Sequence, residues 1–221
     1  MIGISFNKKE FEYDAYTLVK AFYPKEDIEM YGTWEEEGPK DYEKLVSISY
    51  GDRVVIGVHT REHTLEDSAP YDEKEDRKKR KNTLKQILYK LLVQETGQTL
   101  PWGNLTGIRP VKIAMGLIEE GMTNAQAADF MRKTYFTSNE KTALAIAIAN
   151  RERDILKDID YKRGYSLYVG IPFCPSICLY CSFSSSPLEK WRDRVEDYLT
   201  ALLKELDFIS QAMKDRPLNT I

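Results

Sequence analysis

Residues 168–183 read Tyr168-Val-Gly-Ile-Pro-Phe-Cys174-Pro-Ser-Ile-Cys178-Leu-Tyr-Cys181-Ser-Phe183. Three cysteines fall on one short loop, and the 221-residue chain contains no others. A disulfide between any two of them would leave the third over, so a disulfide framework does not account for the set. Three thiols in a C-x3-C-x2-C spacing after a short apolar strand indicate a metal site. The spacing suggests an iron–sulfur cluster with one iron left open.

The number of thiols decides what such a cluster could do. A 4Fe–4S cluster is normally held by four cysteine thiolates, one on each iron. Three ligands leave one iron available to an exogenous ligand, just as a catalytic zinc site keeps a position that a structural site fills. Two other roles for the three cysteines stay open, a zinc site and inert packing. Zinc would need a fourth ligand, and His59 and His63 lie more than a hundred residues upstream. Inert buried cysteines are the second, although packing explains their clustering poorly.

This stretch resembles the radical S-adenosylmethionine (SAM) enzymes, in particular the branch that contains oxygen-independent coproporphyrinogen III oxidases. That branch shows Tyr-x-His-Ile-Pro-Phe-Cys followed by x3-Cys-x-aromatic-Cys. A second stretch, Leu100-Pro-Trp-Gly-Asn-Leu-Thr-Gly-Ile-Arg-Pro110, resembles the N-terminal region of the HemZ-type coproporphyrinogen dehydrogenases. Two residues depart from the pattern. Gly170 replaces the family's histidine, and Phe183 stands where the well-studied oxidases carry a fourth cysteine and heme-chaperone relatives carry phenylalanine.

The resemblance implies a set of site residues and cofactors. Cys174, Cys178 and Cys181 would hold a 4Fe–4S cluster, whose open iron binds the amino and carboxylate groups of SAM. Tyr168 and Tyr180 would lie near SAM, or would only pack around the cluster. Reductive cleavage of SAM would give a 5′-deoxyadenosyl radical, with a flavodoxin or ferredoxin as electron donor. The resemblance assigns no further catalytic residue.

In the full-length enzyme, the implied reaction is the oxidative decarboxylation of coproporphyrinogen III in heme biosynthesis. The radical abstracts hydrogen from a propionate side chain, and loss of carbon dioxide and an electron leaves a vinyl group. A cluster does not by itself fix a substrate. The alternative is a heme-binding or heme-trafficking protein without this turnover, which Phe183 permits. A folded module with a cluster-free loop is a further alternative.

Composition excludes several other classes of protein. The net charge of −3 argues against a general nucleic-acid binder. No apolar run approaches the roughly 20 residues that a membrane span requires. Residues 1–9 lack the basic, apolar and small segments of a signal peptide. The expected compartment is the cytoplasm, where thiols stay reduced.

The expected fold is an α+β N-terminal region with a helical segment, followed by the first β/α unit of a truncated radical-SAM barrel, a partial TIM-like α/β barrel. Four segments are predicted: an α+β region over 1–80, a helical region over 81–155, a linker over 156–165 and the start of the barrel over 166–221. Because a single β/α unit cannot bury both faces of a parallel strand, this chain alone is expected to be inactive.

In the first segment, strands are predicted over 2–6 and 28–31, and a helix over 11–22. The runs 45–50 and 53–60 alternate around the turn pair Gly51-Asp52 and predict a hairpin. His59 and His63 are interpreted as surface residues.

The charge block 72–81 runs into a helix with apolar positions at helical spacing, which Gly97 ends. The basic half, Arg77–Lys81, is either a phosphate-binding patch or a solvated helix face. Helices then follow through residue 155. Pro110 is expected at a helix start and Gly121 just past its end, and Thr123-x-x-Gln126 and Thr137-x-x-Glu140 are read as capping boxes.

A polar and aromatic loop precedes these helices and contains Trp102, Asn104, Thr106 and Arg109. It either closes over a site and grips a carboxylate through Arg109, or forms a turn anchored by Trp102. Farther on, an apolar strand over 166–171 is expected to enter the cysteine loop. A helix from Ser186 follows it, and residues 217–221 resemble the entry to a second strand. Active sites of such barrels lie on the loops after the strands, where the cysteines are.

Overall fold

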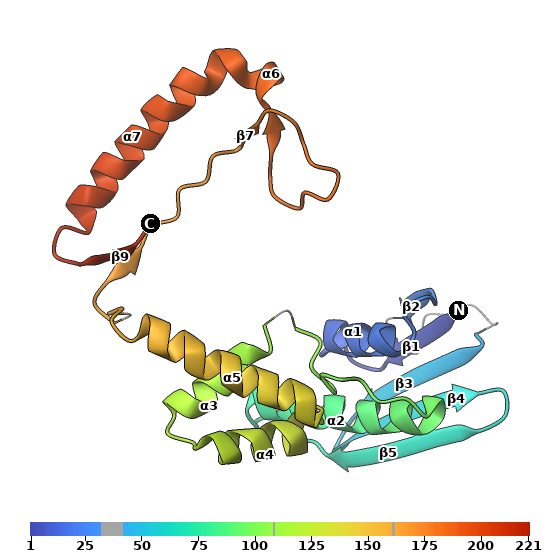
Figure 1. Ribbon diagram of the computed structural model, residues 1–221. Coiled ribbons are helices and arrows are strands. Elements are labelled where there is room, and N and C mark those ends of the chain that lie inside the picture. The colour runs from blue at the N-terminus through green and yellow to red at the C-terminus, as the bar shows by residue number, and fades with distance from the viewer. Residues whose placement is uncertain (32–41, 108, 161) are drawn as a thin grey trace. The chain divides into compact units, whose positions relative to one another are not determined.

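The computed structural model describes residues 1–31, 42–107, 109–160 and 162–221 (Figure 1). The chain is a mixed α/β protein that divides into two compact units, Met1–Asp154 and Ile155–Ile221. Each unit is described by itself. The predicted division into four segments stays a prediction. No helix in the described ranges has the length and apolar character needed to cross a membrane.

The first unit contains a five-stranded sheet in the order β2-β1-β3-β4-β5. β1 pairs in parallel with both β2 and β3, whereas β3, β4 and β5 form an antiparallel meander. The predicted strands and hairpin are confirmed, and β5 is an edge strand that the sequence pattern missed. The strands are β1 (Ile2–Phe6), β2 (Ile28–Tyr31), β3 (Lys44–Tyr50), β4 (Arg53–Thr60) and β5 (Thr64–Pro70).

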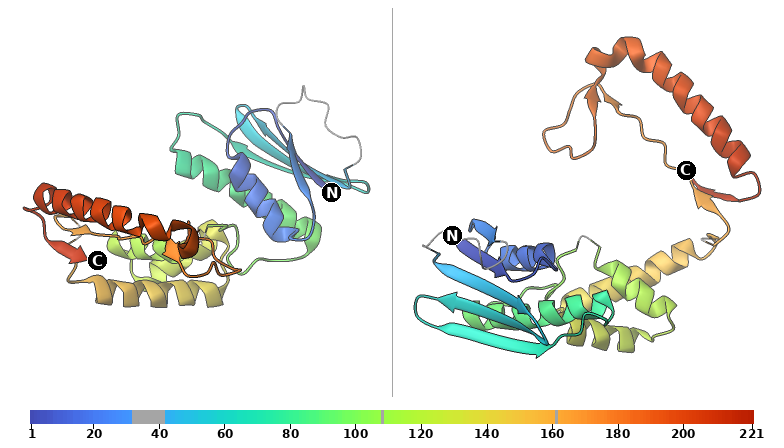
Figure 2. Two further views of the ribbon diagram at one scale, coloured as in Figure 1. Left: turned by 90° about the horizontal axis from the view of Figure 1, so that it is seen from above. Right: turned by 180° about the vertical axis from the view of Figure 1, so that it is seen from behind.

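One face of this sheet is buried by α1 (Glu12–Phe22) and α2 (Arg77–Thr96), which pack against each other as well as the strands (Figures 1 and 2). Alternate strand residues point into this core, as expected for a sheet with one covered face. Burial of these side chains is the main force that holds the layers together. The largest fully buried side chains from the sheet and both helices include Phe6, Ile4, Leu18, Ile48, Ile56, Leu84, Leu88 and Leu92.

Helix α2 begins and ends as its sequence predicts. The Asp76 carboxylate accepts a hydrogen bond from the Lys79 amide at 3.1 Å, which caps the first turn. Gly97 ends the helix at φ 67°, and its amide donates to the Val93 carbonyl at 2.8 Å. The acidic half of the charge block therefore precedes the helix, and its basic half opens it.

A second core lies between α3 (Val111–Glu119), α4 (Asn124–Tyr135) and α5 (Asn139–Leu156). The expected capping box is confirmed at α4, where Thr123 and Gln126 exchange both hydrogen bonds. Pro110 immediately precedes α3, and Gly121 follows its end at φ 97°, both as predicted.

The second predicted capping box is wrong by one residue. The Ser138 hydroxyl accepts a hydrogen bond from the Lys141 amide at 3.2 Å and so caps α5. Thr137 is buried, and its hydroxyl pairs with that of Thr142 at 2.7 Å. The buried Thr137 hydroxyl therefore bonds the Thr142 side chain, and the helix cap falls to Ser138.

The loop before α3 joins the two cores, which supports its interpretation as a turn. Gly103 adopts φ 58°, and a Cβ built there would lie 1.9 Å from the Tyr135 carbonyl oxygen. Asn104 is buried, and its amide donates to the same carbonyl at 2.9 Å. Trp102 packs against the second core. Arg109 is exposed, residue 108 lies outside the described residues, and the grip on a carboxylate stays a prediction.

Two charge networks anchor side chains around the sheet. Glu95, whose side chain is 5% exposed, accepts hydrogen bonds from Lys44 and from His63 Nε2. Although burial opposes its ionisation, these two partners hold the pKa of Glu95 below its usual value. His63 is exposed, as predicted, whereas His59 is half-buried and bonds Ser47 at 2.8 Å.

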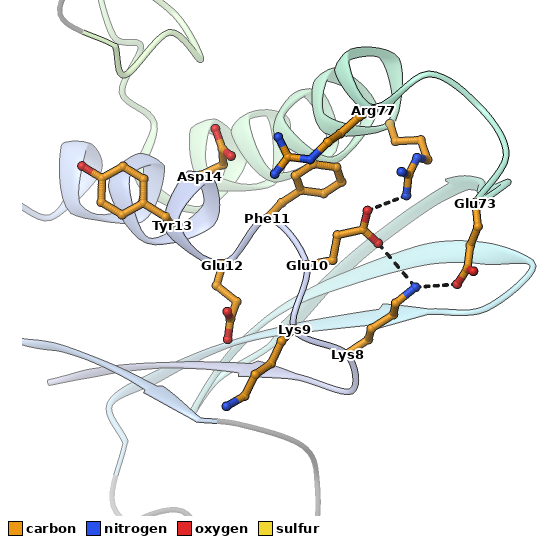
Figure 3. A pocket seen from close by; sticks show the side chains of 10 residues that line it. Lys8, Lys9, Glu10, Phe11, Glu12, Tyr13, Asp14, Glu73 and Arg77 are labelled. Carbon is orange, nitrogen blue, oxygen red and sulfur yellow. Dashed lines mark hydrogen bonds and ion pairs between the residues drawn. The ribbon is translucent and has the colours of Figure 1, made fainter.

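The second network surrounds Glu10, at a cavity of about 610 Å³ beside the start of α1 (Figure 3). The Glu10 carboxylate pairs with Arg80 and Lys8, and Lys8 also reaches Glu73. The guanidinium of Arg77 lies 5.3 Å from the centre of the Phe11 ring. The charges at this cavity thus pair largely with one another.

The second unit is built from two short parallel strand pairs and one long helix. β6 (Tyr165–Ser166) pairs with β9 (Leu218–Thr220), and β7 (Phe173–Cys174) pairs with β8 (Ser186–Pro187). A turn of helix, α6 (Leu188–Trp191), and a short 3-10 segment lead into α7 (Val195–Ala212).

The predicted strand over 166–171 is wrong beyond Ser166, because a strand needs a partner and β9 reaches only the first residues of that run. The predicted second strand is confirmed as β9. None of the described residues from 155 to 221 is buried. The truncated barrel therefore stays a prediction.

Candidate metal centre

The first cysteine ends β7, and the other two lie on the segment that leads from β7 to β8, ahead of α6. Figure 1 shows β7 and α6. All three are free thiols. Cys174 belongs to β7 and is half-buried, Cys178 is exposed and Cys181 is half-buried. The loop closes on itself because the Ser186 amide donates to the Pro172 carbonyl at 2.7 Å, which brings its two ends together.

A tight turn fixes the second half of the loop. The Cys181 amide donates to the Cys178 carbonyl at 3.0 Å. The Cys181 sulfur lies 4.0 Å from the Phe183 carbonyl oxygen and 3.9 Å from the Ser185 hydroxyl. Both contacts are weak, because a thiol is a weak donor and a weak acceptor.

A cavity of about 380 Å³ adjoins the loop and collects part of the predicted site. Tyr168, Cys174 and Cys181 line it together, with Phe183 in the place of the absent fourth cysteine. Cys178 and Tyr180 do not line it, and Tyr180 is 90% exposed. The fold thus brings three of the five predicted site residues to one cavity.

The donor set fits an iron–sulfur cluster in its chemistry. Thiolates are the ligands that such clusters use, and three stand on one loop with no competing disulfide. Across the ranges that the structure describes, however, no three His, Cys, Asp or Glu side chains are gathered closely enough to hold a metal ion. Cys178 is the thiol on the exposed turn. Convergence of the three sulfurs therefore stays a prediction.

Tyr198 of α7 supports this loop, a role that sequence reasoning missed. Its hydroxyl donates to the Gly170 carbonyl, and its ring meets Phe173 edge-on with centres 5.3 Å apart. The sequence showed Tyr198 only as part of an apolar helical stripe. Gly170 lies close to the Tyr168 ring, and a Cβ at this position would be 3.2 Å from it. A side chain at position 170 would therefore need that ring to shift.

Large apolar side chains around the loop are open to solvent. Tyr168 is 87% exposed and Phe183 is 80% exposed, and Leu179 is fully exposed. On α7, Leu203 and Phe208 are also exposed. Of these side chains, Tyr168 and Phe183 lie at the same cavity as Cys174 and Cys181.

One curated protein is similar to this chain over most of its length. Over 187 residues the chain is 34% identical to the oxygen-independent coproporphyrinogen-III oxidase-like protein HemZ of Bacillus subtilis (strain 168). The match covers 81% of this chain and 37% of that protein, so the chain spans little more than a third of the length of its curated relative. No family model and no solved structure matches the chain.

Proposed function

Because the chain belongs to the HemZ-type family of oxygen-independent coproporphyrinogen-III oxidase-like proteins, we propose that it carries the cofactor loop of a radical-SAM enzyme of heme biosynthesis. The observation that carries the proposal is the set of three free thiols beside one cavity, in a chain that is 34% identical to HemZ. Cys174, Cys178 and Cys181 are the proposed ligands of a 4Fe–4S cluster.

Bound cluster and SAM would supply a carbon radical able to remove hydrogen from a propionate side chain of coproporphyrinogen III. The residues of this chain have the tasks of binding, orienting and excluding water. Phe173 and Tyr198 hold the strand that carries Cys174. Tyr168 lies at the cavity wall, where its ring could contact SAM. Tyr180 is the second proposed SAM contact, on the exposed turn.

The proposed substrate is a porphyrinogen, the electron donor a flavodoxin or ferredoxin, and the compartment the cytoplasm. A second candidate function is heme binding or heme trafficking without turnover. Phe183 favours it, because this residue occupies the position of the fourth cysteine of the oxidases and lines the same cavity as Cys174 and Cys181.

The test is electron paramagnetic resonance of the anaerobically reconstituted and reduced chain, recorded with and without SAM. An open iron predicts a cluster signal that shifts when SAM is added, and the Cys178→Ser variant should lose it. A signal that SAM leaves unchanged would contradict the proposal of an open iron.

Hemin titration separates the second candidate from the first. The leading proposal predicts no stoichiometric hemin complex in the Cys178→Ser variant. Tight hemin binding at one equivalent, kept in that variant, would favour heme trafficking instead.

A further inference from the structure

The first unit contains a second cavity, of about 590 Å³, that the proposed function does not use. It lies where α1, α2 and the loop after Trp102 meet. Its size falls in the range of small-molecule sites, roughly 300–1,000 Å³. Polar and apolar side chains both line it, namely Tyr13, Asp14, Thr17, Lys78, Lys81, Asn82, Lys85, Asn104, Leu105, Thr106, Ile113 and Tyr135.

Three lysines of α2 give this cavity its charge. Lys78, Lys81 and Lys85 are spaced three and four residues apart, so they share one face of the helix. Asp14 is the only acidic residue among the lining side chains. Its carboxylate lies 3.7 Å from the Lys81 nitrogen and 3.9 Å from the Lys85 nitrogen. Both distances exceed a normal hydrogen bond, so the carboxylate attracts both ammonium groups without using up their N–H donors.

Lys85 is the unusual member of the set, because only 7% of it is exposed. Its nitrogen donates to the Thr106 hydroxyl at 2.9 Å. That hydroxyl lies 3.0 Å from the hydroxyl of Thr17, which in turn donates to the Asp14 carbonyl at 3.1 Å. Each hydroxyl has one proton, so Thr106 must donate to Thr17. Within the described residues, the chain of bonds uses both hydroxyl protons and one proton of the Lys85 ammonium.

The Lys85 ammonium has more N–H donors than nearby acceptors. Two N–H donors of a buried ammonium have no hydrogen-bond partner among the described residues. A buried charge is costly unless it is paired and hydrogen-bonded. Leu105, Ile113 and Tyr135 add apolar wall to the same cavity.

We propose that this cavity binds a small organic carboxylate, which accepts hydrogen bonds from Lys85 and Lys81 and packs its apolar body against Leu105 and Ile113. An organic carboxylate suits the site better than inorganic phosphate, because phosphate cannot use the apolar wall that Leu105, Ile113 and Tyr135 offer. The inference concerns a site in the first unit and does not depend on the cysteine loop.

Burial lowers the pKa of Lys85 to about 8. The charged and titratable groups that line the cavity with it are Tyr13 and Asp14 on α1, Lys78 and Lys81 on α2, and Tyr135 at the end of α4. A bound carboxylate favours the protonated amine, so binding should weaken as the pH rises from 7 to 9.

Isothermal titration calorimetry of the full chain with naphthoate tests the proposal, with naphthalenemethanol as the neutral analogue. One site per chain is expected for naphthoate, and at least about tenfold weaker binding for the alcohol. Lys85→Met and Lys81→Met should each lower the affinity about tenfold, because each removes a charged hydrogen bond. The matched control Lys79→Met removes the same charge from an exposed side chain outside the cavity and should change affinity less than about twofold.

Lys81→Met is expected to fold normally, because the Lys81 side chain is 35% exposed, so a loss of affinity in this variant does not reflect misfolding. Circular dichroism should show the wild-type spectrum in this variant. Absence of saturable binding, equal binding of the neutral analogue or an equal loss in Lys79→Met would overturn the proposal. Inorganic phosphate that binds as tightly as naphthoate would overturn the choice of an organic ligand.

Discussion

Replacing Lys85 by methionine should stabilise the protein at neutral pH and lose that advantage at alkaline pH. Lys85 is buried in the folded protein, and burial is the largest cause that lowers its pKa, from 10.5 to about 8. Asp14 opposes this effect and Lys81 adds to it. Methionine has a similar length and no charge, so the variant removes the burial cost while keeping most of the packing.

The size of the effect follows from linkage. A difference of about 2.5 pKa units, at about 1.4 kcal/mol per unit, corresponds to about 3 kcal/mol. The folded-state pKa lies below the unfolded value, so between pH 8 and 10.5 the unfolded chain binds the proton more strongly. Wild-type stability therefore rises with pH across this window. Below pH 8 the wild-type protein bears the full cost of burying the charged Lys85 side chain, about 3 kcal/mol. Loss of the donor to the Thr106 hydroxyl costs the variant about 1 kcal/mol.

The expected net gain for Lys85→Met is thus about 2 kcal/mol at pH 7, and by pH 10 it should turn into a small loss. Urea unfolding followed by near-ultraviolet circular dichroism, which reports the buried tyrosines of the first unit, measures both values. The pKa of Tyr50 and of Tyr71 is raised by burial, so tyrosine ionisation destabilises both proteins alike at high pH. Exposed Lys79→Met should stay within about 0.5 kcal/mol of wild type. A stability difference independent of pH would refute the reasoning.

Two further perturbations test the fold of the first unit. Gly103→Ala should lower the free energy of unfolding by more than about 3 kcal/mol, because the new Cβ would meet the Tyr135 carbonyl at 1.9 Å. Gly97 also has a positive φ but open space around it, so Gly97→Ala should cost about 1 kcal/mol. Urea midpoints that fall equally in the two variants would contradict this. Glu95→Gln should cost about 1–3 kcal/mol at pH 7, since it leaves Lys44 with a neutral partner. The pKa of Glu95 is lowered in the folded state, so its contribution is present above the unfolded value of 4.5 and fades as the pH falls. A cost that is the same at pH 7 and pH 3 would count against the pairing.

Local sequence signals predicted most of the first unit, because its elements carry their own start and stop residues. The Asp76 cap and Gly97 fix α2, and the Gly51-Asp52 turn pair fixes the hairpin. The strand β5 was missed because its sequence, Thr-Leu-Glu-Asp-Ser-Ala-Pro, is largely polar and ends in proline. An edge strand takes its place from its neighbour β4 and needs little apolar pattern of its own.

Features that depend on tertiary context could not be read from the chain. Lys85 stands in a helix rich in lysine, where a solvated face is the natural interpretation. In the structure it is buried, and its nitrogen donates to Thr106, 21 residues along the chain. The strand predicted after Ser166 was wrong for the complementary reason, because an apolar run becomes a strand only where a partner strand exists. The three cysteines stand out by their spacing, but spacing does not say whether their sulfurs converge, because that depends on how the loop packs.

The most direct test of the central claim is the iron and sulfide content of the anaerobically reconstituted 221-residue chain. If Cys174, Cys178 and Cys181 hold one 4Fe–4S cluster, wild type should contain about four irons and four sulfides per chain, and each single alanine variant should lose most of them. Ser185→Ala, which alters a neighbour of the Cys181 thiol without removing a ligand, should keep the wild-type content. Iron that does not exceed the level in a variant lacking all three cysteines would contradict the account.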